Sequence, residues 1–390
     1  MKVELGITGG IAAYKTPTLV RLLKTNGFDV HCSLSTSAIR FVTPETLAVV
    51  SENPVNGPGP DQAHKIRHLD ARQSADVFIV APATANFIAK ASHGICDSPL
   101  LSSFLAFPGR KILVPAMHDT MWENPATSEN IRRLKSWGVE IIGPSTGPLA
   151  SGDFGPGRMI DLELIVHKLN LLKFDCPKLD GINILIGLGG TSEPIDPVRY
   201  ITNRSTGKFG STLAHTFSLQ GATVTAVSTI DLINNPHISQ VIRVETSDQM
   251  RDAITTHWAE NDVLVMPAAV SDFRPKQLRQ EKIKRSHSIT MDFEPTIDIL
   301  GSLHKRESQV MIGFCLDDED RLMSSAEDKL NRKKLDAVIA NTATQFGKDQ
   351  RTFTIVTPEG SQAFSKATLP AAASEISGLI TRLVGRSQAL

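Results

Sequence analysis

Several segments of this 390-residue chain place glycine, hydroxyl and amide groups where they could bind a phosphorylated ligand. GITGGIAAYK (6–15) sets Gly9 and Gly10 between an expected strand and an expected helix. Backbone N–H groups at such a helix start can approach a phosphate, and the helix dipole favours the anion. The segment lacks the GxGxxG spacing, so a tight structural turn explains the same glycines equally well. The turn by itself leaves both interpretations open.

Three more segments of the first half bring polar or small residues to the ends of expected strands. STSAIRFVTPET (35–46) supplies hydroxyls, and APATANFIAK (81–90) supplies small residues against which a flat ring could lie. PAMHDTMW (115–122) ends the next strand and carries His118. In these four segments, the candidate cofactor-binding residues are Gly9, Gly10, Ser35, Ser37, Ala81, Thr84 and Met117.

The second half contains a longer polar segment, GGTSEPIDPVRYITNRSTGKFG (189–210). Its glycines and hydroxyls lead into an expected helix next to Lys208, a pattern typical of a loop that binds phosphate. An ordinary helix cap accounts for Ser205 and Thr206 but not for the whole run. The segment therefore predicts a phosphate-binding loop.

Charged side chains follow later strands of the second half. Asp272 ends a strand in PAAVSDFRP (267–275), and Lys282 lies in EKIKR (281–285). Lys329 and Lys333 are four residues apart, so on a helix they share one face. Lysines suit a triphosphate because each is a mobile point charge on a long stem. A solvated charged surface explains each segment when it is taken alone.

Short apolar strands alternate with amphipathic helices in both halves, which predicts two α/β, doubly wound, Rossmann-like domains with parallel sheets. In such sheets ligands bind at the carboxyl ends of the strands. We expect one domain over 1–168, a linker over 169–180 and a second domain over 181–390. The expected elements are strands at 3–6, 29–34, 77–82, 111–115, 139–143, 182–187, 223–228, 263–267, 310–314 and 337–340, a hairpin near 352–357, and helices that include 11–25 and 370–384.

The composition excludes some classes of protein. Lysine plus arginine and aspartate plus glutamate are equal at 41 each, so nothing in the total charge favours nucleic acid or an anionic membrane. No apolar run approaches the length of a membrane span. The four cysteines form no CxxC, which argues against zinc and disulfides and suits a reducing compartment. We expect a cytoplasmic protein whose anionic ligands are held by local sites.

The four segments of the first half together resemble the flavin-binding cysteine decarboxylases, specifically the N-terminal half of the bifunctional coenzyme A biosynthesis proteins. The resemblance covers about residues 1–165, and SGDFGPGRM (151–159) is similar to the substrate flap of that family. It implies that FMN oxidises a cysteinyl thiol, that carbon dioxide leaves from the resulting thioaldehyde, and that the electrons then return. It also implies a flavodoxin-like domain with His68 as the catalytic base.

Two positions depart from this family at residues that would touch the substrate. The asparagine that binds the substrate carboxylate is replaced by His118, and the flap cysteine that reprotonates the product is replaced by Ser151. A protonated histidine would stabilise the charge that decarboxylation must lose. A serine hydroxyl is a poorer acid than a thiol. Residual decarboxylation and a degenerate flavin scaffold both remain open.

The second half resembles phosphopantothenate–cysteine ligase over about residues 181–385. The resemblance implies that a carboxylate attacks the α-phosphate of CTP, that pyrophosphate leaves an acyl-cytidylate, and that the amine of cysteine displaces CMP. It implies that Asn203 stabilises the acyl-cytidylate, that Asp272 contacts the cytosine or ribose, and that Lys282 neutralises phosphate charge. Further nucleotide contacts are implied for Ile297, Asp298, Ile299, Leu300, Phe314, Lys329 and Lys333. Mg²⁺ would bridge the phosphates, and its protein ligands are unknown.

The expected function is therefore coenzyme A biosynthesis from phosphopantothenate, cysteine and CTP by a bifunctional ligase and decarboxylase. The alternatives are a ligase with a degenerate flavin domain, or a non-catalytic regulatory or scaffold relative. The resemblance also implies a homo-oligomer, with trimeric contacts in the flavin domain and dimeric contacts in the ligase domain.

Overall fold

The computed structural model describes residues 1–57, 75–174, 176–284, 289–342 and 350–387. The chain divides into two compact units. The first comprises Met1–Lys173 with Ile233–Pro236, and the second comprises Phe174–Leu232 with His237–Leu390. The expected linker at 169–180 begins inside helix α8 (Leu162–Leu171), because the apolar residues that bury this helix continue to Leu171. The exact residues at which the linker begins and ends therefore stay a prediction.

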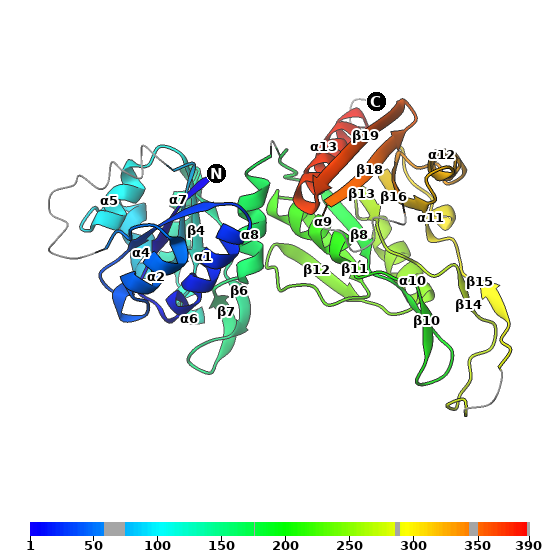
Figure 1. The fold of residues 1–390 in the computed structure, drawn as a ribbon, viewed down its shortest axis with the longest axis horizontal. Helices are drawn as coiled ribbons and strands as arrows, with labels where there is room; N and C mark the ends of the chain where they lie inside the picture. Colours follow the sequence, from blue (N-terminus) through cyan, green and yellow to red (C-terminus); the bar gives the residue numbers. More distant parts are fainter. Residues whose placement is uncertain (58–74, 175, 285–288, 343–349, 388–390) are drawn as a thin grey trace. The chain divides into compact units, whose positions relative to one another are not determined.

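In the described part of the first unit, five parallel strands form one sheet in the order β2-β1-β3-β4-β5 (Figure 1). This is the strand order of flavodoxin-like sheets. The strands are β1 (Lys2–Ile7), β2 (Asp29–Leu34), β3 (Val77–Ala83), β4 (Arg110–Pro115) and β5 (Glu140–Ile141). The last is shorter than the expected 139–143. Val139 N–H donates to Leu134 O at the end of the preceding helix, and Gly143 has a left-handed φ of 89°.

Helices cover both faces of this sheet. One face packs Phe78 and Val80 against Phe87 of α4 and Phe104 of α5. On the other side, α1 and α2 contact each other and β2, and α8 packs against α1. The helical segments of the unit are η1 (Ile11–Lys15), α1 (Thr16–Thr25), η2 (Ala38–Arg40), α2 (Pro44–Ser51), α4 (Ala85–Ser92), α5 (Pro99–Ala106), α6 (Asp119–Trp122), α7 (Pro125–Ser136) and α8. An antiparallel hairpin, β6 (Ser145–Pro148) and β7 (Phe154–Arg158), stands apart from the sheet.

The second unit has a larger sheet. Among its described residues, eight strands follow the order β12-β11-β8-β13-β16-β17-β18-β19 (Figure 1). The strands from β12 to β17 are parallel, and β18 and β19 are added antiparallel. The six parallel strands have the Rossmann order 3-2-1-4-5-6. The strands are β8 (Asn183–Leu188), β11 (Thr223–Ser228), β12 (Ile238–Arg243), β13 (Val263–Met266), β16 (Val310–Asp317), β17 (Ala337–Thr342), β18 (Gln350–Thr357) and β19 (Gly360–Thr368).

Two apolar clusters form on opposite faces of this sheet. One contains Phe217 of α9 and Ile380 of α13, and the other contains Ile254 of α10 and Leu330 of α12. The helices are α9 (Lys208–Leu219), α10 (Ser247–Trp258), α11 (Ile299–Ser302), α12 (Leu322–Arg332) and α13 (Leu369–Ser387). Two short antiparallel pairs project beyond the sheet: β9 (Ser192–Pro194) with β10 (Tyr200–Thr202), and β14 (Phe273–Pro275) with β15 (Phe293–Pro295). Both units are thus doubly wound, which confirms the predicted fold class.

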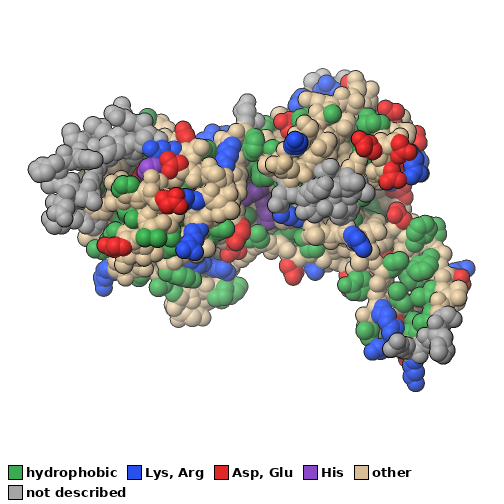
Figure 2. Space-filling view, in the orientation of Figure 1, with side chains coloured by type: hydrophobic (Ala, Val, Ile, Leu, Met, Phe, Trp, Pro, Cys, Tyr) green, Lys and Arg blue, Asp and Glu red, His purple; other side chains and the backbone are tan. Residues whose placement is uncertain are grey.

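The surface agrees with the balanced charge of the sequence. On the face shown in Figure 2, acidic and basic side chains are interspersed on both units. Within the described part of the chain, none of the helices is both long enough and apolar enough to cross a membrane. Apolar side chains gather on the β14–β15 arm, which we define as the described residues of 273–295; Phe273, Leu278, Ile289 and Phe293 are exposed there (Figure 2).

Candidate functional site

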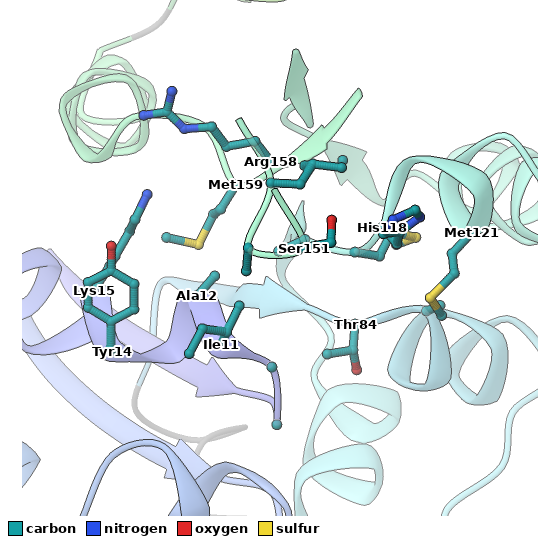
Figure 3. Close-up of a pocket in the computed structure, with 18 of the residues that line it drawn as sticks. Ile11, Ala12, Tyr14, Lys15, Thr84, His118, Met121, Ser151, Arg158 and Met159 are labelled. Carbon is teal, nitrogen blue, oxygen red and sulfur yellow. The ribbon is translucent and has the colours of Figure 1, made fainter. Parts of the chain in front are cut away.

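A cavity of about 700 Å³ lies at the carboxyl ends of β1 and β3, where the strand order of the first sheet reverses (Figure 3). This is the position at which doubly wound sheets bind ligands, and the volume is that of a small-molecule site. The structure brings seven of the candidate residues to its lining: Gly9, Gly10, Ser37, Thr84, Met117, His118 and Ser151.

The glycine turn fits closely against the loop after β2. A Cβ atom on Gly9 would lie 2.3 Å from Ser37 Oγ and 2.7 Å from the Ser37 backbone carbon. Thr84 N–H donates to Thr8 Oγ1 over 3.0 Å, which fixes the loop after β3 against the end of β1. Thr84 also begins α4 as its N-cap. Backbone groups of two strand ends therefore meet at one cavity wall.

A second cavity, of about 410 Å³, adjoins the first and shares Ser37, Thr84 and Asn86 with it. It is lined by hydroxyls of Ser35, Thr36 and Ser37 and by the guanidinium of Arg40. Hydroxyl donors beside a cation suit a phosphate. The wider cavity suits a flat ring, because small residues and backbone form much of its wall. The two together fit a flavin mononucleotide.

One candidate of the first half lines neither cavity, and one lies outside the residues that the structure describes. Ala81 is fully buried within β3 and lines neither cavity. Small residues at the end of a strand serve packing as often as ligand contact, and the sequence does not separate the two. His68 lies outside the described residues.

His118 lies at the rim of the first cavity, between two carboxylates. Its Nε2 is 3.1 Å from Asp153 Oδ2, and its Nδ1 is 2.6 Å from Asp119 Oδ1. Asp153 belongs to the turn between β6 and β7 that also carries Ser151. Hydrogen bonds from His118 and then from Ser151 lower the pKa of Asp153, because they stabilise the carboxylate. The histidine thus binds the flap to the loop after β4.

Sequence reasoning did not single out Asp153. Asp153 lies two positions after Ser151 in SGDFGPGRM. The sequence indicated a flap at this segment, but it did not indicate a role for the Asp153 side chain. The hairpin reaches the loop through a close backbone contact: Met117 N–H donates to Gly157 O over 2.9 Å. A Cβ atom on Gly157 would lie 2.3 Å from Met117 O, so this approach requires glycine.

The second unit has a cavity of about 580 Å³ at the carboxyl ends of β13 and β16. Nine of the candidate nucleotide-site residues line it. They are Asn203, Asp272, Ile297, Asp298, Ile299, Leu300, Phe314, Lys329 and Lys333. These residues come from the loops after β10, β13 and β15 and from β16 and the end of α12, so they meet only in the folded chain.

Hydrogen bonds position several of these side chains. Asn203 Nδ2 donates to Val270 O over 3.0 Å, which holds the amide at the end of β13. Lys329 Nζ donates to Phe314 O over 2.5 Å, and Lys333 Nζ lies 2.7 Å from Asp298 Oδ1. Burial is the main cause that lowers the pKa of Lys329, and the charge of Lys333 lowers it further. Lys329 and Lys333 thus line the same cavity, in agreement with the spacing of four residues that places them on one helical face.

Two basic residues that sequence reasoning missed line the same cavity, Arg204 and Arg332. Each directly adjoins a predicted residue, Arg204 after Asn203 and Arg332 before Lys333, so the signal was present in NRSTGK and NRKK. With the two lysines they make four basic side chains in a lining that contains two carboxylates, Asp272 and Asp298. Such a lining favours an anionic ligand.

Lys282 does not line this cavity. It is exposed on the β14–β15 arm, and the neighbouring Ile283 N–H donates to Asp196 Oδ2 over 3.1 Å. Within one chain, Lys282 is therefore separate from the other nucleotide-site candidates. In the part of the chain that the structure describes, no group of three or more His, Cys, Asp or Glu side chains could hold a metal ion.

Comparisons with known proteins agree with this division of fold and sites. Residues 1–172 match the family model described as Flavoprotein. Residues 179–383 match the model described as DNA/pantothenate metabolism flavoprotein C-terminal domain. The chain is thus a two-domain protein that joins a flavoprotein domain to that C-terminal domain.

Full-length relatives define the family. The chain is 36% identical to the coenzyme A biosynthesis bifunctional protein CoaBC of Vibrio vulnificus (strain YJ016), with 98% of each chain covered. It is 35% identical to the protein of the same name from Mycolicibacterium smegmatis, with 87% of this chain and 86% of that one covered. The chain belongs to the family of bifunctional coenzyme A biosynthesis proteins, which confirms the resemblance found in the sequence.

Solved structures resemble each half. The C-terminal domain of a coenzyme A biosynthesis bifunctional protein CoaBC has a TM-score of 0.46 and 30% identity, covering 53% of this chain and 98% of that chain. A PPC decarboxylase mutant complexed with pantothenoylaminoethenethiol has a TM-score of 0.39 and 28% identity, covering 44% of this chain and 97% of that chain.

Proposed function

We propose that the protein performs two steps of coenzyme A biosynthesis, the CTP-dependent joining of phosphopantothenate to cysteine and the FMN-dependent decarboxylation of the product. The observation that carries the ligase assignment is the basic cavity at the carboxyl ends of β13 and β16 in the second sheet. It combines Asn203, Lys329 and Lys333 in a chain that belongs to this family along its whole length.

In the ligase step, the basic lining attracts CTP and neutralises its phosphates. Lys329 and Lys333 approach from α12 as mobile point charges, and Arg204 offers a planar fork of donors. The amide of Asn203 stabilises the charge on the acyl-cytidylate, and the Phe314 side chain packs on the nucleotide. Mg²⁺ bound with the nucleotide would supply further neutralisation of the phosphate charge and would favour departure of pyrophosphate. Catalysis is chiefly positioning and charge stabilisation.

Pyrophosphate release from CTP tests the ligase. We expect release that depends on phosphopantothenate, with Mg²⁺ present, and amide formation when cysteine is added. Asn203→Ala should lower the rate by about 10²-fold, as does the loss of one donor to a developing charge. Asn331→Ala is the matched control, because Asn331 is exposed on α12 and does not line the cavity. Without release by the unchanged protein, the non-catalytic scaffold interpretation would stand.

For the decarboxylase step, the two adjoining cavities of the first unit would hold FMN. Thr84 would contact the ring. Backbone N–H groups of Gly9 and Gly10 would approach the phosphate, and Ser35, Ser37 and Arg40 would contact it. The bound flavin supplies a two-electron oxidant for the substrate thiol. His118 would bind the substrate carboxylate, Ser151 would close the flap over it, and His68 would take the thiol proton.

Purified protein tests the flavin assignment directly. We expect a yellow preparation that releases FMN on denaturation. A colourless protein that also fails to bind added FMN would contradict it. Decarboxylation is then measured as carbon dioxide from phosphopantothenoylcysteine. If FMN binds but no carbon dioxide forms, the protein is a ligase with a degenerate flavin domain.

We also propose that the chain forms a homo-oligomer, with dimeric contacts through the second unit and trimeric contacts through the first. The exposed apolar side chains of the β14–β15 arm support a contact in the second unit, since monomers rarely expose such a group. Light scattering of the full chain measures the mass, and a monomer would contradict the proposal.

A further inference from the structure

Lys15 places a positive charge in the lining of the first cavity. It ends η1, and its ammonium is half-buried in the lining. Among the described residues, its Nζ has neither a hydrogen bond nor an ion pair. Burial is the main cause that lowers the pKa of Lys15, the nearby Arg158 charge lowers it further, and the charge of Asp161 opposes this shift in part. A partly buried ammonium in such surroundings is unfavourable unless a ligand supplies an anion.

Arg158 brings a second cation to the same end of the cavity. It ends β7 and lies two-thirds buried, with Nη2 3.0 Å from Asp161 Oδ1. Lys15 and Arg158 with the single carboxylate of Asp161 leave one net positive charge. Tyr14 lines the cavity beside Lys15 and can donate from its phenol (Figure 3).

The cavity has two distinct ends. In Figure 3, Lys15, Tyr14 and the Arg158 guanidinium lie on the left, whereas His118 and Met121 lie on the right, with Ser151 between them. The proposed thiol substrate is also charged at both ends, with a carboxylate beside its thiol and a phosphate at the other end. An extended ligand with two anionic ends matches a cavity with two groups of donors.

We propose that Lys15, Arg158 and Tyr14 form a subsite for the phosphomonoester end of the thiol substrate, an inference that rests on the proposed decarboxylase function. Lysine offers a mobile charge and arginine a planar fork, a combination suited to phosphate oxygens. The flavin phosphate is the other source of the same chemistry. It has its own pocket at Ser35, Thr36, Ser37 and Arg40, so the substrate is the occupant that we assign to Lys15.

Binding of phosphopantetheine and pantetheine to the FMN-loaded full chain tests the subsite. The change in flavin absorbance is the readout, because it reports ligands in the first unit and is silent to binding in the second. We expect the phosphorylated thiol to bind at least about tenfold more tightly than pantetheine. Lys15→Gln should remove most of this preference and leave the FMN content unchanged. Inorganic phosphate should compete with phosphopantetheine but not with pantetheine.

Three further variants sharpen the test. Lys15→Arg keeps the charge and should keep the preference for the phosphorylated thiol. Arg158→Lys loses the planar guanidinium and should weaken this preference. The second variant tests the subsite even if Lys15→Gln does not fold. Lys135→Gln is the matched control, because Lys135 is exposed on α7 and lies outside the cavity. It should behave like the unchanged protein.

Three outcomes would overturn the subsite. Equal affinity of the unchanged protein for both thiols overturns the subsite alone. Loss of FMN in Lys15→Gln with an intact preference for the phosphorylated thiol assigns these cations to the cofactor instead. No flavin response to either thiol overturns the subsite together with the decarboxylase function.

Discussion

The Nε2 atom of His118 lies 3.1 Å from Oδ2 of Asp153. This contact joins the loop after β4 to the β6–β7 flap, and Ser151 lies on the same flap two residues away. An asparagine at 118 would offer a neutral amide to a substrate carboxylate, whereas the imidazole already has a carboxylate partner. In this protein the flap is therefore coupled through one side chain to position 118, where we propose that the substrate carboxylate binds.

Restoring the two family residues should accelerate decarboxylation. His118→Asn frees Asp153 and supplies a neutral donor, and Ser151→Cys supplies a more acidic proton donor. We expect the double variant to release carbon dioxide from phosphopantothenoylcysteine at least about tenfold faster than the unchanged protein. Ligase activity in the second unit serves as the internal control and should not change. Equal rates in both proteins would show that His118 and Ser151 already support full turnover.

Gly9→Ala should remove flavin binding. The added Cβ would lie 2.3 Å from Ser37 Oγ and 2.7 Å from the Ser37 backbone, so the two loops must separate. We expect less bound FMN and a loss of about 1–3 kcal/mol in the free energy of unfolding. Visible absorbance and thermal unfolding measure the two effects. Gly57→Ala is the control, because the nearest atom among the described residues, Leu34 Cβ, would be 3.8 Å away. Normal FMN content in Gly9→Ala would argue against this wall of the site.

The affinity for CTP should depend on pH through Lys329. Burial lowers the pKa of Lys329 below its ordinary value of 10.5, so its charge is lost earlier on the alkaline side. Between the lowered pKa and 10.5 the unfolded chain binds more protons than the folded chain, so the stability of the ligand-free protein rises with pH while CTP affinity falls.

The measurement is the KM for CTP across this alkaline range. We expect an increase of at least about tenfold, the effect of losing one charged contact. Lys329→Arg keeps its charge there and should flatten the profile. The same rise in both proteins would assign the pH dependence to another group.

We expect Lys282 to act in the nucleotide cavity of another subunit, not in the cavity of its own chain. It is exposed on the apolar β14–β15 arm and does not line the cavity that contains Asn203. We expect Lys282→Gln and Asn203→Ala each to lower amide formation by about 10²-fold. Subunits that carry the two changes separately should recover part of the activity after mixing and reassembly. A normal rate in Lys282→Gln would remove Lys282 from the chemistry and, with it, the ligase assignment made from the sequence.

Regular elements could be predicted well because apolar periodicity is a local property. Strands β2 and β11 have the bounds that the sequence indicates, Asp29–Leu34 and Thr223–Ser228. The helix expected at 11–25 instead begins as the 3-10 segment Ile11–Lys15, and α1 starts only at Thr16. Pro17 near the α1 start lacks an N–H group, which favours this break, but the sequence alone does not fix its position.

The sequence by itself determined the two doubly wound domains, the family and the strand ends at which each site forms. Lys329 and Lys333 were paired correctly because a spacing of four fixes a shared helical face. Only the tertiary structure decided that Asp153 meets His118, that Lys15 and Arg158 line one end of a cavity, and that Lys282 stays outside its own. Those relationships join residues far apart in the chain, and they depend on how hairpins pack against loops, which no local pattern of side chains encodes.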